Sequence, residues 1–330
     1  MKNGYLRFEF YLTKLQEHLD KAGKQKNPAL YLYTNGARTP VFMLEGLCKL
    51  YAGLHNKNKF SKLKEHFKLL EDVLGAIDYY DGFAKEFVMQ KNIPAVITKY
   101  LQAFKREKLE HLNEILIEKD WLGKPGKRII KIKEKLEEAD WQKEEEEITN
   151  INRFYIKSIE SINSFAKETG THFDNVESDV HELRRKMRWL SIYPQALRGC
   201  IQLSKKNAPP RLLTKYLTKE IINSPFNKMP DAGDNRHFLL LEQNYFYALS
   251  WMIAEMGKLK DAGLRVIAIR EALQNNASLN EADALKKAYQ ICGKKQPTLT
   301  DILGNADKIC NTYFKEKNLQ HLIIGNSQVV

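Results

Sequence analysis

The sequence predicts an all-α protein, and three observations carry this prediction. Apolar residues recur at spacings of three and four along almost the whole chain, which is the period of an amphipathic helix. Proline is rare, with 10 in 330 residues, so long helices are allowed. No stretch rich in Gly, Ser or Pro divides the chain, which favours one large unit over residues 1–330, or two closely packed parts.

The first three helices follow from the apolar spacing and from helix-breaking residues. An amphipathic helix is expected over residues 5–23, and Asn27-Pro28 separates it from an apolar helix over about 29–54. A third helix is expected over residues 60–90. Its apolar residues are spaced by three and four and are expected in the core: Leu63, Phe67, Leu70, Leu74 and Ile77.

Residues 94–168 are richer in charge than the helices before them. The sequence Gly-Lys-Pro-Gly at 123–126 predicts a turn between two antiparallel arms, which makes this region a helical hairpin. Residues 131–147 hold eight acids and four lysines, a charge of about −4 by count, and residues 144–147 are four consecutive glutamates. Such a run is usually a solvated face. Alternatively it faces a basic protein partner, and the protein is then a helical scaffold.

A cationic helix face is predicted at residues 181–188, His-Glu-Leu-Arg-Arg-Lys-Met-Arg. At about 100° per residue, His181, Arg184 and Arg188 fall within a sector of about 60°. The adjacent side of the helix carries apolar residues: Val180, Leu183, Met187 and Leu190. One side of this helix is therefore expected in the core, and the other is suited to an anion.

Positive charge is concentrated around this helix. Residues 181–219 hold ten Lys and Arg residues and one acid, Glu182, a local charge of about +9 in a chain whose net charge is +12. Such a concentration suits a polyanionic partner. The candidate anion-binding residues, in order of preference, are His181, Arg184, Arg188, Arg185, Lys186, Arg38, Arg198, Lys205, Lys206 and Arg211.

A faint internal repeat is visible when the chain is shifted by 146 residues. Arg38 then aligns with Arg184, and Asn35 aligns with His181. Each half also has a later helix in which a glycine is followed closely by an aspartate: Gly75 and Asp78 in the first, Gly257 and Asp261 in the second. Because apolar helices align easily with one another, the repeat is a hypothesis.

The pattern His181-x-x-Arg184-Arg185-x-x-Arg188, in the second half of a duplicated helical chain, resembles the CHAD domain, the conserved histidine α-helical domain. Residues 74–78, Leu-Gly-x-x-Asp, followed by Asp81, look like the end of a later helix in that family's first half. The resemblance covers about residues 29–320. It implies two pseudo-symmetric bundles of about four helices each, with long antiparallel helices and a basic central channel. Residues 1–168, including the hairpin 94–168, are then the first helical half, and residues 169–330 are the second.

The resemblance also implies that inorganic polyphosphate is bound in the channel. The channel-lining residues that it implies are His181, Arg184, Arg188 and, from the first half, Arg38. Asn35 stands where the family has a first-half histidine, and Phe42 and Met43 stand where further basic residues are usual. Weak or absent binding is therefore expected in the first half.

The residues by themselves favour a polyanion without specifying polyphosphate. Arginine presents a planar fork of donors to phosphate oxygens, and lysine adds a mobile point charge. The chief alternative is a nucleic-acid-binding helical protein, in which bases stack on Trp189, Tyr193 and Tyr216. These aromatics lie at apolar helix positions that are more typical of a core, and no known nucleic-acid-binding motif is present.

Other functional classes have thin support. No phosphate-binding loop, nucleophile elbow or H-E-x-x-H motif is present, so we predict no enzyme activity, no metal and no cofactor. Asp78 and Asp81 are spaced for a divalent cation, but a solvated or capping role is more typical. The scattered cysteines are expected as reduced thiols: Cys48, Cys200, Cys292 and Cys310.

The expected location is the cytoplasm. The N-terminal residues run into charged positions without the apolar region of a secretory signal. No segment reaches the roughly 18 apolar residues that span a bilayer.

Overall fold

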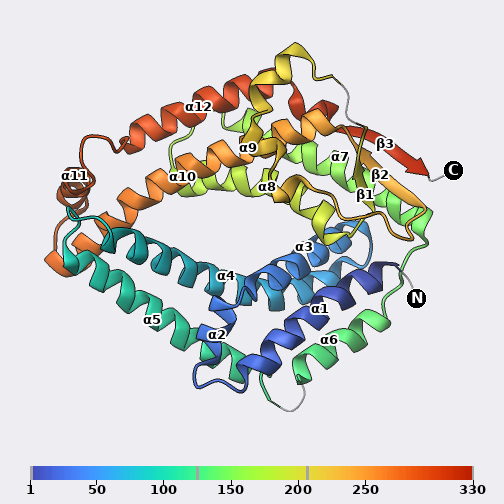
Figure 1. The fold of residues 1–330 in the computed structure, drawn as a ribbon, viewed down its shortest axis with the longest axis horizontal. Helices are drawn as coiled ribbons and strands as arrows, with labels where there is room; N and C mark the ends of the chain where they lie inside the picture. The colour runs from blue at the N-terminus through green and yellow to red at the C-terminus, as the bar shows by residue number, and fades with distance from the viewer. Residues whose placement is uncertain (1–2, 124–125, 206–207, 329–330) are drawn as a thin grey trace. The chain divides into compact units, whose positions relative to one another are not determined.

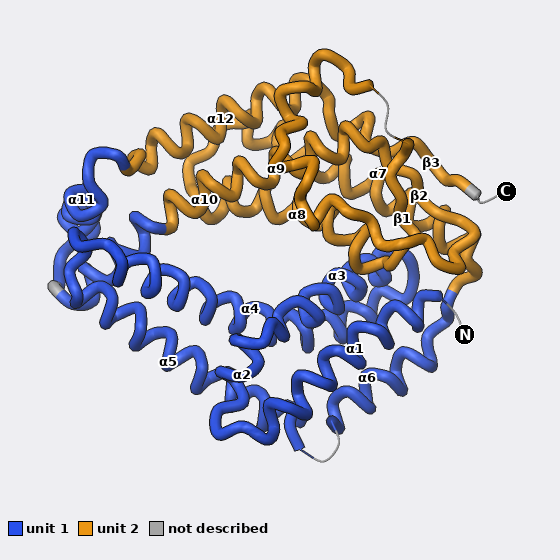
Figure 2. Tube along the Cα trace, in the orientation of Figure 1, with its two compact units in different colours: residues 1–141, 265–295 blue, residues 142–264, 296–330 orange. Residues whose placement is uncertain are grey.

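The structure is a computed structural model that describes residues 3–123, 126–205 and 208–328 (Figure 1). These residues are mostly helical, as the sequence predicts. They fall into two compact units, shown in Figure 2. The first unit is residues 1–141 with 265–295, and the second is residues 142–264 with 296–330. The sequence-based halves, 1–168 and 169–330, divide the chain differently, because residues 142–168 belong to the second unit and residues 265–295 to the first.

The first unit is helical throughout its regular elements. They are α1 (Asn3–Ala22), α2 (Pro28–Thr34), α3 (Arg38–Leu54), α4 (Lys57–Val88), α5 (Ala95–Glu118), α6 (Lys127–Glu137), α11 (Glu281–Cys292) and the C-terminal part of α10 (Gln243–Ala277). The five apolar residues predicted for the core are all buried in α4. The predicted helix over 29–54 is in fact two helices, because the chain turns between α2 and α3, where Gly36 has a φ of +75° that favours glycine.

The region predicted as a two-armed hairpin, residues 94–168, contains three helices within its described part. It comprises α5, α6 and α7 (Glu144–Glu168), and α7 belongs to the second unit. The indole N–H of Trp141 donates to the Leu136 carbonyl at 2.8 Å, so a side chain satisfies an acceptor in the last turn of α6. Lys124 and Pro125, in the predicted turn, lie outside the described residues.

An aromatic cluster forms part of the core of the first unit. Phe8 of α1, Tyr51 of α3 and Phe60 of α4 surround Trp141, with ring centroids 5.2–5.8 Å from its own. Arg7 is also buried, and its guanidinium donates to the Tyr51 hydroxyl at 2.8 Å. The cluster therefore joins α1, α3 and α4 to the segment that follows α6.

The second unit combines helices with a small sheet. Its helical elements are α7, the π-helical segment η1 (Val176–His181), α8 (Glu182–Ala196), η2 (Arg211–Tyr216), α9 (Lys219–Ile222), η3 (Pro225–Asn227), the N-terminal part of α10, α12 (Leu299–Lys315) and η4 (Asn318–His321). The strands are β1 (Ile201–Leu203), β2 (His237–Leu241) and β3 (Ile323–Gln328).

The sheet was not predicted from the sequence. Its order is β1-β2-β3, with β1 parallel and β3 antiparallel to β2, so that Leu239 lies opposite both Ile201 and Asn326. The strands are three, five and six residues long. Apolar runs this short carry no period that distinguishes a strand from a helical segment.

The two units repeat one local arrangement. Asn27 caps α2, and Asn175 caps η1, each by accepting backbone N–H groups with its side chain. A later helix in each unit accepts one further N–H beside the cap, at 2.9 Å: Asn113 of α5 accepts from Ala29, two residues after Asn27, and Asp307 of α12 accepts from Phe173, two residues before Asn175. The helix that follows the capped segment is α3 in the first unit and α8 in the second. The two arrangements are similar, but the further N–H donors lie on opposite sides of the capping asparagine, so the internal repeat stays a hypothesis.

Candidate functional site

The apolar seam of α8 fixes which side of this helix faces outward. Val180, Leu183, Met187 and Leu190 are all fully buried, as predicted. Tyr155 of α7 donates its hydroxyl to the Leu190 carbonyl at 3.0 Å. The cationic face of α8, defined here as Arg184 and Arg188 together with His181, the last residue of η1 before α8, lies beside this seam.

Arg184 is the central residue of this face, and it packs against α10. Its Nε donates to the Ile253 carbonyl at 3.1 Å. The guanidinium lies against Gly257, where an added Cβ would come within 3.0 Å of Nε. Across the described residues, its Nη1 and Nη2 groups have no hydrogen-bond partner and no ion pair. Burial lowers the pKa of Arg184, nearby Asp261 opposes this, and the side chain remains charged.

The neighbouring basic side chains are engaged with acids of their own helix. His181 Nδ1 lies 2.9 Å from a Glu177 carboxylate oxygen, and this hydrogen bond lowers the pKa of Glu177. Arg185 and Lys186 both pair with Glu182, at 2.5 and 3.5 Å. Arg188 is exposed. Arg184 therefore differs from Arg185 and Lys186, because its charge is not matched by a hydrogen-bonded carboxylate.

The remaining predicted residues of the second unit lie beyond α8. Arg198 follows the end of α8, Lys205 follows β1, and Arg211 begins η2; all three are exposed. Lys206 lies outside the described residues. The +9 segment is thus spread over several elements, and the cationic face of α8 contains only part of it.

Arg38 of α3 is the counterpart of Arg184 in the first unit, and it is neutralised. Its Nε and Nη2 donate to one oxygen of Glu71 at 3.0 and 2.8 Å, and its Nη1 donates to Asp78 at 2.9 Å. The guanidinium lies against Gly75 of α4, where an added Cβ would come within 2.9 Å of Nη2. Arg38 therefore has two carboxylate partners within the protein.

Sequence reasoning missed the role of the two glycines. Both glycines belong to the repeat, and the absence of a side chain leaves room for a guanidinium against each helix. Neither has a positive φ, so backbone conformation gives no reason for glycine there. The pairing could have been found from the sequence by aligning the two halves so that Arg38 and Gly75 match Arg184 and Gly257. The sequence pattern did not indicate that Glu71 accepts from Arg38 or that the Ile253 carbonyl accepts from Arg184.

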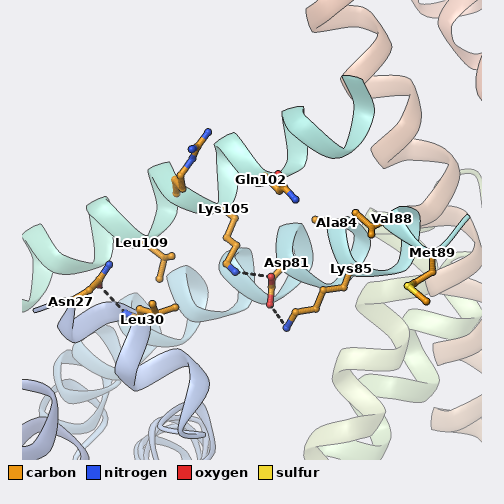
Figure 3. A pocket seen from close by; sticks show the side chains of 11 residues that line it. Asn27, Leu30, Asp81, Ala84, Lys85, Val88, Met89, Gln102, Lys105 and Leu109 are labelled. Atoms are coloured by element: carbon orange, nitrogen blue, oxygen red, sulfur yellow. Dashed lines mark hydrogen bonds and ion pairs between the residues drawn. The ribbon is translucent and has the colours of Figure 1, made fainter. Parts of the chain in front are cut away.

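A separate pocket lies in the first unit, and Figure 3 shows the side chains that line it. It has a volume of about 820 Å³ and is formed mainly by α4 and α5. At its wall Asp81 pairs with Lys85 at 2.6 Å and Lys105 at 2.7 Å, and it accepts from the Tyr33 hydroxyl at 2.7 Å. Burial raises the pKa of Asp81, but these hydrogen bonds outweigh burial and bring it to about 2. The single negative charge of Asp81 is therefore shared by two of the pocket's lysines and offsets one of their two positive charges.

The divalent-cation alternative has no support in this geometry. Asp78 pairs with Arg38 and Asp81 pairs with two lysines, so each carboxylate already has a cationic partner. Among the described residues, no three His, Cys, Asp or Glu side chains come together as metal ligands.

The aromatic residues considered for base stacking belong to the core. Trp189, Tyr193 and Tyr216 are at most 7% exposed. A base cannot stack on a ring that is covered by the protein. This observation removes the main feature that favoured nucleic acid.

The acidic run is only partly solvated. Glu144 accepts the backbone N–H groups of Arg236 and His237, at 2.5 and 2.8 Å, and Glu147 is buried. The four glutamates occupy the first turn of α7, where negative charge is stabilised by the helix dipole. Only Glu145 and Glu146 are exposed, which leaves a small surface for a basic partner.

No protein-family model matches the chain, and no curated protein and no solved structure matches it. Within residues 3–123, 126–205 and 208–328, none of the helices has both the length and the apolar character that crossing a membrane requires.

Proposed function

We propose that this protein binds inorganic polyphosphate, or a similar phosphate-rich polyanion, through the cationic face of α8. In this proposal the chain is a divergent CHAD-like protein of the cytoplasm, and α8 lines its basic channel. The ligand is held and is not converted. The observation that carries the proposal is Arg184, a partly buried arginine whose Nη1 and Nη2 groups have no partner within the described residues.

The chemistry of Arg184 suits a phosphate. A charge that is partly removed from water is stabilised when an opposite charge and hydrogen bonds replace the lost hydration. The two Nη groups present donors in a plane that matches two phosphate oxygens. Because Ile253 already holds Nε, the guanidinium is oriented before a ligand arrives, which reduces the ordering cost of binding.

A polymer of phosphates gains more from this face than a single ion does. His181 and Arg188 lie about one turn before and after Arg184, so they are about 4.5 and 6 Å away from it along the helix axis. A chain of phosphates that contacts Arg184 can therefore place further phosphate groups at its neighbours, so a polymer makes more contacts with this face than a single phosphate does. The buried aromatics give RNA no stacking surface here, which favours a partner recognised by charge alone.

The test is a binding titration with long-chain polyphosphate at several salt concentrations, with single-stranded RNA of equal charge as competitor. Arg184→Gln and Arg38→Gln each remove one positive charge, and Arg38 serves as the matched control because its charge is already neutralised. We expect Arg184→Gln to weaken binding about tenfold, the loss of roughly one charge-assisted hydrogen bond, and Arg38→Gln to leave it unchanged.

Two results would contradict the proposal. One is an equal effect of the two substitutions, which indicates a diffuse basic surface. The other is displacement of polyphosphate by RNA at equal charge, which favours a nucleic-acid-binding protein. Circular dichroism of each variant establishes that the helices are retained.

A further inference from the structure

Helices α4 and α10 contact Arg38 and Arg184 through residues at equivalent positions. Gly75 receives Arg38, and Gly257 receives Arg184, which sets a shift of 182 residues between the helices. Four residues before each glycine stands the partner of the arginine Nε. It is the Glu71 side chain in the first unit, at 3.0 Å, and the Ile253 carbonyl in the second, at 3.1 Å. The two guanidinium groups are thus held by equivalent positions.

The residues that complete the two arrangements have opposite chemistry. Three residues after the glycine, Asp78 of α4 accepts from Arg38 Nη1 at 2.9 Å. The same position of α10 is Lys260. Within the described residues, Lys260 pairs with Asp261 at 2.8 Å and leaves the Nη groups of Arg184 without a carboxylate. Two acids of the first unit are therefore replaced by an isoleucine and a lysine in the second.

We propose that Arg38 marks a second phosphate site of the same kind, which Glu71 and Asp78 keep closed by occupying the place of the ligand's anionic oxygens. This inference rests on the proposed function, since it takes the anion bound at Arg184 to be a phosphate. The carboxylates of the first unit then indicate how the ligand is held in the second. Its anionic oxygens accept hydrogen bonds from the guanidinium, which lies beside a glycine. The protein binds phosphate through one open site and retains one occluded copy.

Burial indicates which carboxylate does most to close the site. The Glu71 side chain is 15% exposed and accepts two hydrogen bonds, whereas the Asp78 side chain is 56% exposed. An exposed ion pair contributes little, because water screens it and both side chains lose freedom in forming it. Removal of the Glu71 charge is therefore the decisive change, and removal of the Asp78 charge completes it.

The experiment measures polyphosphate affinity of the full chain carrying Glu71→Gln with Asp78→Asn. We expect a gain of about tenfold, comparable to one added charge-assisted hydrogen bond. The control, Glu145→Gln with Glu146→Gln, removes two exposed negative charges from the second unit and isolates the general electrostatic contribution. In the Glu71→Gln/Asp78→Asn background, adding Arg38→Gln is expected to abolish the gain.

The inference is overturned if the gain equals that of the control or survives Arg38→Gln. If the double variant does not fold, Glu71→Gln alone gives the same readout, because it removes the more buried carboxylate. Failure of the proposed function is distinguishable: there the parent protein shows no loss of binding with Arg184→Gln, whatever the result at Arg38.

Discussion

Replacing Gly257 by alanine is expected to weaken polyphosphate binding without unfolding the protein. A Cβ at this position would lie 3.0 Å from Arg184 Nε, 3.3 Å from Nη2 and 3.5 Å from Cζ. Ordinary contacts begin near 3.4 Å, so the guanidinium must move by about 0.4 Å. The Nε hydrogen bond to Ile253, already 3.1 Å long, then reaches the limit of hydrogen-bond distance.

The stability change is expected to be small. Loss of one hydrogen bond costs about 1 kcal/mol. Alanine in a helix interior is better than glycine by about 0.5–1 kcal/mol, which offsets most of that cost. Binding has no such offset, because the phosphate contacts depend on the position of the Nη groups, and the expected loss of affinity is about threefold to tenfold.

Gly75→Ala is the matched comparison. Its Cβ would lie 2.9 Å from Arg38 Nη2, so it disturbs the ion pair with Glu71 and leaves Arg184 untouched. Both variants are assayed by polyphosphate titration at fixed salt and by urea unfolding. Equal affinity of Gly257→Ala and the parent protein, or an equal loss in Gly75→Ala, would refute the reasoning.

Three further predictions concern other parts of the chain. The Asp81 pKa of about 2 lies below its ordinary 3.8, so this group stabilises the folded state above about pH 4 and the contribution is lost as the pH falls through 2. Urea unfolding of Asp81→Asn should accordingly show a deficit at pH 7 that shrinks between pH 4 and 2, and a constant deficit would count against it. Thr298 and Asp301 form a capping box at the start of α12, so Thr298→Ala should lower the free energy of unfolding by about 1 kcal/mol, and no change would contradict that role. Burial raises the pKa of the Cys48, Cys292 and Cys310 thiols, but Cys292 is partly exposed whereas the other cysteines are buried, so a thiol reagent followed by mass spectrometry should modify Cys292 first; equal rates would be inconsistent with the packing.

Helices with a strong apolar side could be predicted from sequence. The seam of α8 and the core positions of α4 lie where their spacing places them, since burial of one side fixes the orientation of a helix. The break at Gly36 and the break before α7 were missed, because short polar interruptions and side-chain caps such as the Trp141 indole depend on tertiary contacts. The sheet was missed because its strands are too short to show a period.

The sequence was enough to locate the candidate site but not to predict which acids pair with its arginines. Composition and helical spacing indicated the stripe of His181, Arg184 and Arg188, and the repeat paired Arg38 with Arg184. Which carboxylates reach each guanidinium depends on how one helix lies against the next, and this has no local sequence signal. The structure therefore distinguishes Arg38, whose charge is neutralised by two carboxylates, from Arg184, whose Nη groups have no partner within the described residues.

The most direct test of the central claim is a crystal structure of the full chain with tripolyphosphate. We expect a phosphate group with oxygens about 2.7–2.9 Å from the Nη groups of Arg184, while Arg38 keeps its contacts with Glu71 and Asp78. Tripolyphosphate bound at Arg38 in place of the carboxylates, or only at sites remote from α8, would contradict the account.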